Sequence, residues 1–442
     1  MSGSQCRSSH RSQPLTTKRS HVKVLHTSDW HLGRTTYGHS RASDHEAVLA
    51  EITEIAAATR PDLILNTGDL FDMQRPPLHS LKLATSTLHN LAEIAPVVVV
   101  CGNHDSAAYL HWLHDLLSRS APIHFVTSHD NAVGEVLRLP AGEQAIHVAA
   151  LPFISANRIV NVFDEPGQRR ITYAGHIAGL QQRLMRELRD GFDASRDVSV
   201  FAAHQYIAGA IPSRTENPSH TCDFYATDPQ HLPVVTYAAF GHIHKPQPLP
   251  TTSVTGCYAG SPLQLDFGEV GEDKSVVVAT LQPGQGAVLE RIPLKRGRRL
   301  HYITGTLDEI RTTAASVTTD ICLVTVNTEN HIDNLAGQIR GLLPEATIAD
   351  LRENAADRRL ELLAPVDDAT DVDTTTLFSE YLATRGVQGV SAQQVLQLFS
   401  TLLPHASEHE PPELPEEQLL AADPEIAFPL PATSTATIGG AA

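Results

Sequence analysis

The feature that most constrains this chain is a repeated pattern in which a short apolar run is followed at once by aspartate, asparagine or histidine. Continuous Val/Ile/Leu/Ala runs of this length predict strands that are buried on both faces. Because ligands bind at the carboxyl ends of strands in an open α/β sheet, the pattern predicts one site at one sheet edge. The clusters are Asp29-Trp30-His31, Gly68-Asp69-Leu70-Phe71-Asp72, Gly102-Asn103-His104-Asp105, Ala203-His204 and Gly241-His242-Ile243-His244.

The segments between these clusters indicate the fold class. Residues 44–59 and 77–93 carry apolar side chains at helical spacing. Alternation of such helices with buried strands predicts a layered α/β sheet. The expected strands cover residues 22–27, 63–66, 97–100, 147–151, 198–203 and 237–240.

Composition changes along the chain and predicts its domain organisation. Residues 300–365 have the pattern of a small α+β domain, with strands and helices in alternation. In the helix expected over 391–403, Ser391 and Gln394 match a capping box, and Pro404 ends the apolar stripe. The expected parts are a disordered leader over 1–20, the cluster-bearing domain over 21–288, the small domain over 289–368, a helical element over 369–404 and an acidic, Pro-rich disordered tail over 405–442.

The overall composition allows a sizeable core, because 41% of the residues are hydrophobic and 19% are charged. No apolar run approaches the ~18 residues needed to cross a bilayer. Residues 1–21 lack the apolar stretch of a secretory signal. The five cysteines are scattered and form no CxxC motif. We therefore expect a soluble, cytoplasmic protein in a reducing compartment.

The formal net charge is −17, which argues against a chain that coats nucleic acid by bulk attraction. Residues 1–28 hold five Lys or Arg and no acid, whereas residues 386–442 hold seven acids and no Lys or Arg. The two ends are therefore expected to be tails of opposite sign. A basic run has two interpretations, contact with DNA phosphates or a solvated linker. Its residues are Lys295, Arg296, Arg298 and Arg299.

The residue types in the clusters point to metal chemistry. Two carboxylates, one amide oxygen and four imidazoles suit Mn²⁺, with Fe, Zn or Mg as alternatives. Seven donors are enough for two ions if one carboxylate bridges, and Asp69 is the candidate. Two metals ~3.5–4 Å apart can clamp a phosphate and hold a bridging hydroxide for in-line attack. The predicted ligands are Asp29, His31, Asp69, Asn103, His204, His242 and His244.

His104 directly follows a predicted ligand, and adjacent side chains of an extended segment point in different directions. We therefore expect His104 to face the substrate, where it stabilises the scissile phosphate and protonates the leaving group. Asp72 lies three residues after Asp69. We expect its carboxylate to hold the His104 ring and to favour the charged form of that ring.

Each cluster taken alone has a simpler interpretation. Asp29 could cap a helix, the GDLFD segment could be a turn after a strand, and His204 could be an ordinary histidine at a strand end. The order of the clusters and the βαβ-like gaps between them favour the metal site.

The order D-x-H, GDLFD, GNHD, H, GHxH resembles the calcineurin-like metallophosphoesterase superfamily. Further matches over 29–34 (DWHLGR) and 260–269 (GSPLQLDFGE) resemble the nuclease subunits of bacterial, archaeal and eukaryotic break-repair complexes. The resemblance covers residues 22–403. It implies a four-layer αββα sandwich with a dimetal centre. It assigns His104 as the catalytic histidine, with Asp29, His31, Asp69 and His244 at one metal and Asp69, Asn103, His204 and His242 at the other.

The same resemblance implies an activity and partners. The activity would be Mn²⁺-dependent cleavage of double-stranded DNA ends and hairpins, by 3′→5′ exonuclease and endonuclease action. The partners would be a second copy, bound through helices near 77–93 and 107–118, and an SMC-like ATPase, together forming a heterotetramer. The small domain would cap DNA, and the final helix pair would dock the ATPase. Two other hypotheses are a small-molecule phosphodiesterase or phosphatase with the same site, and a non-catalytic scaffold.

Overall fold

The structure is a computed structural model. It describes residues 21–355, except for 130–131, 157–165, 214, 217, 219, 223–224 and 315–316, together with residues 374–384 and 393–401. The chain divides into two compact units, Met1–Arg359 and Leu360–Ala442. The expected leader, the expected acidic tail and the Ser391 cap lie outside the described residues.

The first sheet has six strands in the order β16-β15-β1-β4-β5-β6. β1, β4, β5 and β6 run parallel, and β15 joins β1 in antiparallel register, with Val22 opposite Leu281. The strands are β1 (Val22–Thr27), β4 (Leu63–Asn66), β5 (Val97–Val100), β6 (Ile123–Val126), β15 (Ser275–Leu281) and β16 (Val288–Pro293).

The second sheet has the order β13-β14-β12-β11-β10-β9. Its four central strands are parallel, and the two edge strands are antiparallel. The strands are β9 (Glu135–Ala141), β10 (Gln144–Leu151), β11 (Val198–His204), β12 (Tyr237–Gly241), β13 (Gln247–Pro248) and β14 (Gly256–Tyr258). Shorter elements are the hairpins β2–β3 (Thr35–Thr36, His39–Ser40) and β7–β8 (Ser128–His129, Ala132–Val133) and the 3-10 turns η2 (Pro229–His231) and η3 (Phe267–Glu269).

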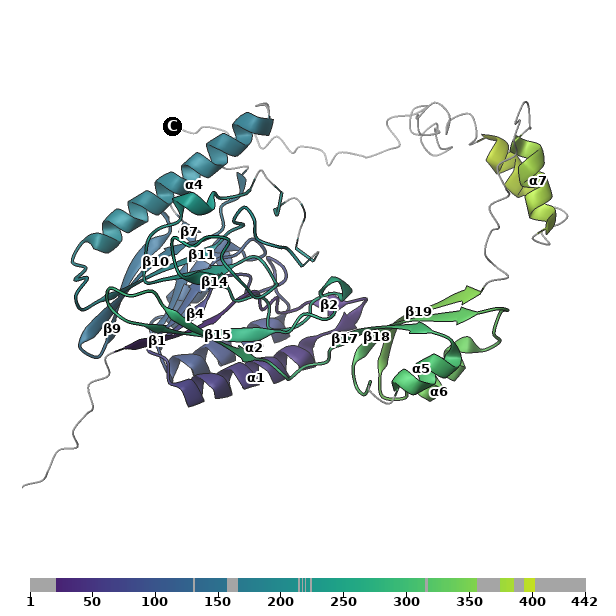
Figure 1. The fold of residues 1–442 in the computed structure, drawn as a ribbon, viewed down its shortest axis with the longest axis horizontal. Coiled ribbons are helices and arrows are strands. Elements are labelled where there is room, and N and C mark those ends of the chain that lie inside the picture. Colours follow the sequence, from purple (N-terminus) through teal and green to yellow (C-terminus); the bar gives the residue numbers. More distant parts are fainter. Residues whose placement is uncertain are drawn as a thin grey trace, which may run out of the picture. The chain divides into compact units, whose positions relative to one another are not determined.

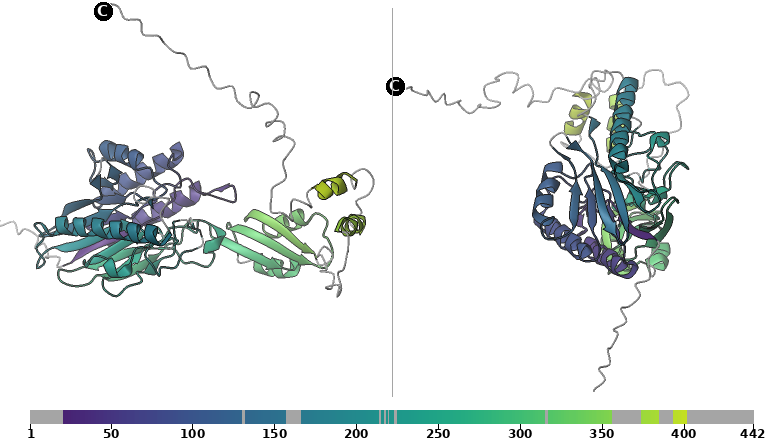
Figure 2. Two further views of the ribbon diagram at one scale, coloured as in Figure 1. Left: turned by 90° about the horizontal axis from the view of Figure 1, so that it is seen from above. Right: turned by 90° about the vertical axis from the view of Figure 1, so that its left-hand side faces the viewer.

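Three apolar cores hold four layers together (Figures 1 and 2). One core joins the outer face of the first sheet to α1 (Ala42–Thr59), α2 (Leu78–Ala92) and α3 (Ala107–Leu117). A second lies between the sheets, and a third joins the second sheet to α4 (Pro166–Arg189). Each fully buried Val or Leu contributes roughly 1.5–3 kcal/mol. The predicted αββα sandwich is confirmed, as are the six predicted strands and the helices over 44–59 and 77–93.

Two sequence expectations about the next region need correction. The first sheet continues past residue 288, because Val288–Pro293 pairs with β15. The small domain is a parallel βαβαβ unit rather than α+β, since its three strands all run the same way. It has its own core around Ile303, Val324 and Ile339. Its elements are β17 (Leu300–Gly305), α5 (Leu307–Ala314), β18 (Ile321–Thr328), α6 (Leu335–Leu342) and β19 (Thr347–Ala355).

Two residues of the basic run before β17 form ion pairs with acids of α1. Arg298 Nη2 lies 2.9 Å from Asp44 Oδ2, and Arg296 Nη2 lies 2.6 Å from Glu54 Oε2. The backbone amides of Lys295 and Arg296 donate to the Glu51 carboxylate. Neither expected interpretation describes Arg296 and Arg298, which fasten this segment to α1 instead of facing DNA or solvent alone.

The second unit contains two described helices, α7 (Thr374–Thr384) and a helix over 393–401. Phe378 and Phe399 stack with ring centroids 4.0 Å apart, so the helices pack on each other. Leu377 and Leu398 remain 45% and 60% exposed. Among the described residues of the whole chain, no helix combines the length and apolarity needed to cross a membrane.

Candidate metal centre

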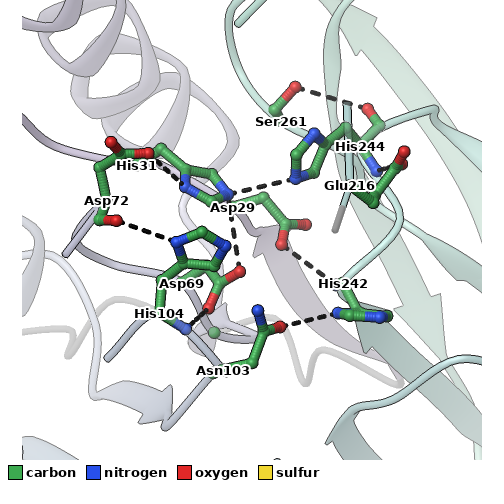
Figure 3. Close-up of polar contacts among 12 residues, drawn as sticks. Asp29, His31, Asp69, Asp72, Asn103, His104, Glu216, His242, His244 and Ser261 are labelled. Atoms are coloured by element: carbon green, nitrogen blue, oxygen red, sulfur yellow. Dashed lines mark hydrogen bonds and ion pairs between the residues drawn. The ribbon is translucent and has the colours of Figure 1, made fainter. Parts of the chain in front are cut away.

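All seven predicted ligands come together at the carboxyl edges of the two sheets. Asp29 and His31 follow β1, Asp69 follows β4, and Asn103 follows β5. From the second sheet, His204 ends β11, and His242 and His244 follow β12. Figure 3 shows the first-sheet side chains facing those of the second sheet across a small gap. The predicted ligands therefore converge as expected, but the expectation of a single sheet edge is corrected, because β1, β4 and β5 belong to one sheet and β11 and β12 to the other.

Several ligand positions have an unusual backbone conformation. Asp29, His31, Asp69 and His242 have φ values of 51°, 47°, 49° and 95°. Such left-handed conformations cost of order 1–3 kcal/mol each in non-glycine residues and cluster at functional sites. Hydrogen bonds between the loops hold them, including Asp29 N to Gly68 O at 2.9 Å. The loops therefore turn the ligands toward one another at some cost in stability.

Two glycines permit this close approach. A Cβ on Gly102 would lie 2.1 Å from Asp69 Oδ1 and 2.3 Å from Asp69 N. A Cβ on Gly68, whose φ is +111°, would lie 2.2 Å from His204 Nδ1. Any side chain at these positions would displace a predicted ligand. The glycines of the GDLFD and GNHD motifs are thus required by space at the site.

His31 and His244 face each other with Nε2 atoms 3.2 Å apart. Behind them, His31 Nδ1 donates to Asp72 Oδ1 at 3.1 Å, and His244 Nδ1 donates to Glu269 Oε1 at 3.0 Å. A histidine whose rear N–H is held by an oxygen directs its other nitrogen at a metal. Asp29 Oδ2 is buried close by and has no hydrogen-bond partner among the described residues.

His204 and His242 form the second pair, around the side chain of Asn103. His204 Nε2 and His242 Nδ1 each lie 2.8 Å from Asn103 Oδ1. The remaining ring nitrogens lie within hydrogen-bond distance of backbone carbonyls, 2.8 Å from Thr67 O for His204 and 3.2 Å from His220 O for His242. The two front nitrogens and the amide oxygen therefore converge on one place.

Asp69 lies between the two pairs. Its Oδ2 is 3.5 Å from His31 Nε2 and 3.4 Å from His204 Nε2. Its Oδ1 accepts the backbone N–H of His104 at 2.8 Å, which fixes the carboxylate. Three groups of possible ligand atoms lie within 4.8 Å of one another: Asp29-His31-His244, Asp29-Asp69-His204 and His31-Asp72-His104. Asp29 belongs to two of these groups, and Asp69 Oδ2 lies between the His31 and His204 rings.

The buried carboxylates of the centre favour positive charge on their neighbours. Burial raises the pKa of Asp29. Burial disfavours the charged form of His204, but the Asp69 and Asp29 carboxylates outweigh it and raise its pKa to about 9. Burial acts likewise on His244, and Glu269 outweighs it, so that this pKa is also about 9. Protons on these rings thus balance the carboxylates. A buried set of carboxylate, amide and imidazole donors with this need fits divalent cations.

Asp72 and His104 meet in a different way from that expected. His104 Nδ1 donates to the backbone oxygen of Asp72 at 2.9 Å, while the Asp72 carboxylate binds His31 Nδ1. The same carboxylate oxygen lies 3.3 Å from Arg34 Nη1. The expectation that the Asp72 carboxylate holds the His104 ring is corrected: its carbonyl does so. The ring centroids of His31 and His104 are 4.7 Å apart, which places His104 beside the ligands.

A second charged cluster behind His244 was not predicted. Lys274 Nζ lies 2.7 Å from Glu269 Oε2 and 2.9 Å from Glu272 Oε2, and it donates to His244 O at 3.0 Å. Glu216 Oε1 accepts the backbone N–H of His244 at 2.8 Å. Glu269 lies in the GSPLQLDFGE segment, so its motif was a signal. Glu216 has no motif, and only the fold brings it to the site.

Asp105 is a further residue whose role the sequence did not show. It is buried, and its carboxylate accepts three backbone N–H groups, from Leu70 at 3.2 Å and from Phe71 and Gly102 at 3.0 Å each. These bonds join the loop that carries Asp69 to the loop that carries Asn103. Asp105 therefore fixes the distance between two predicted ligands.

The family of the chain agrees with this geometry. The calcineurin-like phosphoesterase model matches residues 22–246, and the chain belongs to that family. The match begins at β1 and ends two residues after His244, so it contains all seven predicted ligands. Fold and site together define a phosphoester hydrolase.

The relatives narrow this class, since three of them are named as the D component of the nuclease SbcCD. The one from Bacillus subtilis is 29% identical over 291 residues, covering 63% of this chain and 71% of that protein. The one from Escherichia coli K12 is 25% identical over 405 residues, or 88% of this chain and 100% of that one. The Rhodobacter capsulatus protein is 30% identical over 293 residues, or 62% and 70%. The predicted resemblance to the nuclease subunit of a bacterial complex is confirmed.

Proposed function

We propose that this chain is the nuclease subunit of a complex with an SbcC-like SMC ATPase and that it cleaves double-stranded DNA ends and hairpins with two Mn²⁺ ions. The activity would combine 3′→5′ exonuclease and endonuclease cleavage in DNA repair and recombination. The observation that carries the proposal is the convergence of the seven donors at one place, with Asp69 Oδ2 between His31 and His204. The shared name of the relatives supports the DNA substrate.

The residues of the centre would have two roles, metal binding and proton donation. Asp29, His31 and His244 would hold one ion, Asn103, His204 and His242 the other, and Asp69 both. Ions held there supply Lewis-acid stabilisation of a phosphoryl oxygen and a nucleophile at neutral pH. Because its Nδ1–H donates to the Asp72 carbonyl, His104 presents Nε2 to the substrate. As an imidazolium it would give the Nε2 proton to the leaving oxygen and become the neutral ring that keeps its proton on Nδ1.

The proposed assembly uses two exposed apolar surfaces. On α3, Trp112 and Leu116 are 51% and 53% exposed. This face supports the homodimer within the heterotetramer, because large exposed apolar side chains mark contact sites. On the helices of the second unit, Leu377 and Leu398 are exposed, and we assign these helices to contact with the ATPase. The βαβαβ unit over 300–355 would cap the DNA. Cytoplasmic location remains a prediction.

The test is hydrolysis of a blunt duplex and of a hairpin, with Mn²⁺, ATP and the ATPase partner. We expect cleavage of both, and loss of cleavage in His104→Ala. Bis-p-nitrophenyl phosphate serves as the small ester. A protein that hydrolyses this ester but leaves duplex DNA intact, even with the partner present, contradicts the nuclease proposal and favours a small-molecule phosphodiesterase.

A further inference from the structure

A row of polar side chains crosses the apolar core between the two sheets. On β1, Val22 and Val24 face that core, and His26 follows at the same spacing of two residues. The Nε2 atom of His26 lies 2.9 Å from Oγ1 of Thr67, which directly follows β4 of the first sheet. Its Nδ1 atom lies 2.7 Å from the hydroxyl of Tyr237, which begins β12 of the second sheet. The His26 ring therefore connects the two sheets.

The members of this row are buried and depend on one another. His26, Thr67 and Tyr237 are all inaccessible to solvent, and the Tyr237 hydroxyl lies 3.3 Å from Cys257 Sγ on β14. Burial lowers the pKa of His26 to about 3, so its ring is neutral and has one donor and one acceptor nitrogen. Each hydroxyl beside it can donate or accept, so both ring nitrogens are paired. Removal of one member would leave its buried partners unpaired, at a cost in stability.

Thr67 joins this row to a predicted metal ligand. The carbonyl oxygen of Thr67 lies 2.8 Å from His204 Nδ1. The other ring nitrogen, His204 Nε2, lies 2.8 Å from Asn103 Oδ1 and 3.4 Å from Asp69 Oδ2. A histidine ligand is oriented by the hydrogen bond that its rear nitrogen makes. The Thr67 carbonyl therefore sets the direction in which His204 Nε2 points.

The Thr67 peptide is itself held from several sides. Its N–H donates to Thr27 O at 3.1 Å. A Cβ on Gly241, at the end of β12, would lie 2.3 Å from Thr67 O, so the backbone of the second sheet passes close to this carbonyl. The hydroxyl is the group that His26 holds. The position of Thr67 thus depends on both sheets, which supply the predicted ligands from opposite sides of the centre.

We propose that His26 is a positioning residue of the metal centre, which acts through the Thr67 hydroxyl to fix the carbonyl that orients His204. The proposal rests on the proposed function, because it takes His204 to hold an ion. His26 touches neither that ion nor the substrate and takes part in no chemical step. Loss of its contact with Thr67 should weaken the ion held by His204 more than the ion held by His31 and His244.

The test compares two changes at one position of the full-length chain. Thr67→Val removes the hydroxyl and keeps the carbonyl, whereas Thr67→Ser keeps both. Titration with Mn²⁺ in a calorimeter gives the number of bound ions and the affinity of each. Changing a direct partner of a histidine ligand costs about 10–100-fold in metal affinity, and the hydroxyl acts one contact further away, so we expect about tenfold for one ion in Thr67→Val. Thr67→Ser should bind both ions as the unmodified protein does.

A second variant tests the path through the imidazole. His26→Leu should weaken the same ion to the same extent, because it removes the other partner of the Thr67 hydroxyl. If both residues act through one contact, the double variant His26→Leu/Thr67→Val should lose no more affinity than either single variant. Losses that add in the double variant would contradict a shared path and overturn the role of His26.

A matched control makes the same chemical change at the opposite edge of the sheets. Thr236 is buried just before β12, and its Oγ1 accepts the backbone N–H of Ser199 at 3.1 Å. Thr236→Val also strands a buried partner, so it should lower the urea midpoint as Thr67→Val does, yet leave both Mn²⁺ affinities unchanged. Equal affinities in the two valine variants overturn the positioning role while the proposed function stands. An unmodified protein that does not bind two Mn²⁺ ions overturns both.

Discussion

Two buried polar clusters meet at His244, and they obtain positive charge in different ways. The rear cluster contains its own cation, because Lys274 pairs with Glu269 and Glu272. The front cluster consists of the seven predicted ligands. Its carboxylates lie next to histidines, and Asp69 Oδ2 lies 3.5 Å from His31 Nε2 and 3.4 Å from His204 Nε2. A lysine neutralises its partners permanently, whereas protons on imidazoles can be exchanged for metal ions. One cluster therefore serves stability, and the other can serve chemistry.

Asp69→Ala is expected to have the largest effect on the front cluster. The change removes the carboxylate between the two groups, so we expect fewer than two bound ions and a fall in hydrolysis of about 10⁴-fold or more. Metal content by mass spectrometry and ester hydrolysis measure the two effects. Asp308→Ala is the control, because Asp308 is an exposed aspartate of α5. Two ions retained by the Asp69 variant would contradict the bridge.

His104→Ala separates metal binding from proton transfer within the front cluster. His104 touches the centre only through its neighbours, so both ions should remain bound. Hydrolysis should fall about 10³-fold, in the range for removal of a general acid. Mn²⁺ titration by calorimetry and steady-state kinetics provide the measurements. If metal content falls together with activity, His104 has been assigned the wrong role.

Lys274→Met removes the cation of the rear cluster. The change leaves the buried Glu269 and the partly exposed Glu272 without their cation, and loss of a buried charge's partner costs about 3–5 kcal/mol in the free energy of unfolding. Urea denaturation measures the loss. The double variant Lys274→Met/Glu269→Gln removes one stranded charge and should recover part of the stability. Equal stability of the single variant and the unmodified protein would show that Lys274 does not neutralise this cluster.

The pH dependence of Mn²⁺ affinity is expected to be the smallest effect, and it depends on the protonated histidines of the front cluster alone. The pKa values of His204 and His244 are raised to about 9 without metal. Metal must displace these protons, so Mn²⁺ affinity should rise with pH up to about 9 and then level off. The stability contributed by the two protonated rings is complete below pH ~6.5 and is lost as pH rises through 9. Affinity that levels off near pH 6.5 would contradict the raised values.

Residues 22–27, 97–100 and 237–240 show what the sequence predicts well. Each is a continuous apolar run bounded by polar residues, and each forms a strand that is buried almost throughout. Each of these strands is followed at once by a predicted ligand, Asp29, Asn103 or His242, so the strands marked these residues, although they lie at the edges of two sheets and not of one. The ligand set could therefore be predicted before any contact was known.

Contacts between distant segments were not predictable in this way. Glu216 reaches His244 from a loop without regular structure, and no local pattern marks it. Asp72 lies where expected, but the choice between its carbonyl and its carboxylate depends on the path of the loop. The basic run at 295–299 was expected to face DNA or solvent, because the acids of α1 that pair with Arg296 and Arg298 lie more than 240 residues earlier.

The pairing of β1 with β15 sets the limits of any fragment prepared for recombinant work. The family match stops at residue 246, yet β15 and β16 lie beyond it and cover one side of β1. A fragment cut at that point would leave an unpaired strand edge, which promotes aggregation. It would also lose Glu269 and Lys274. A fragment over 21–294 retains every strand of both sheets.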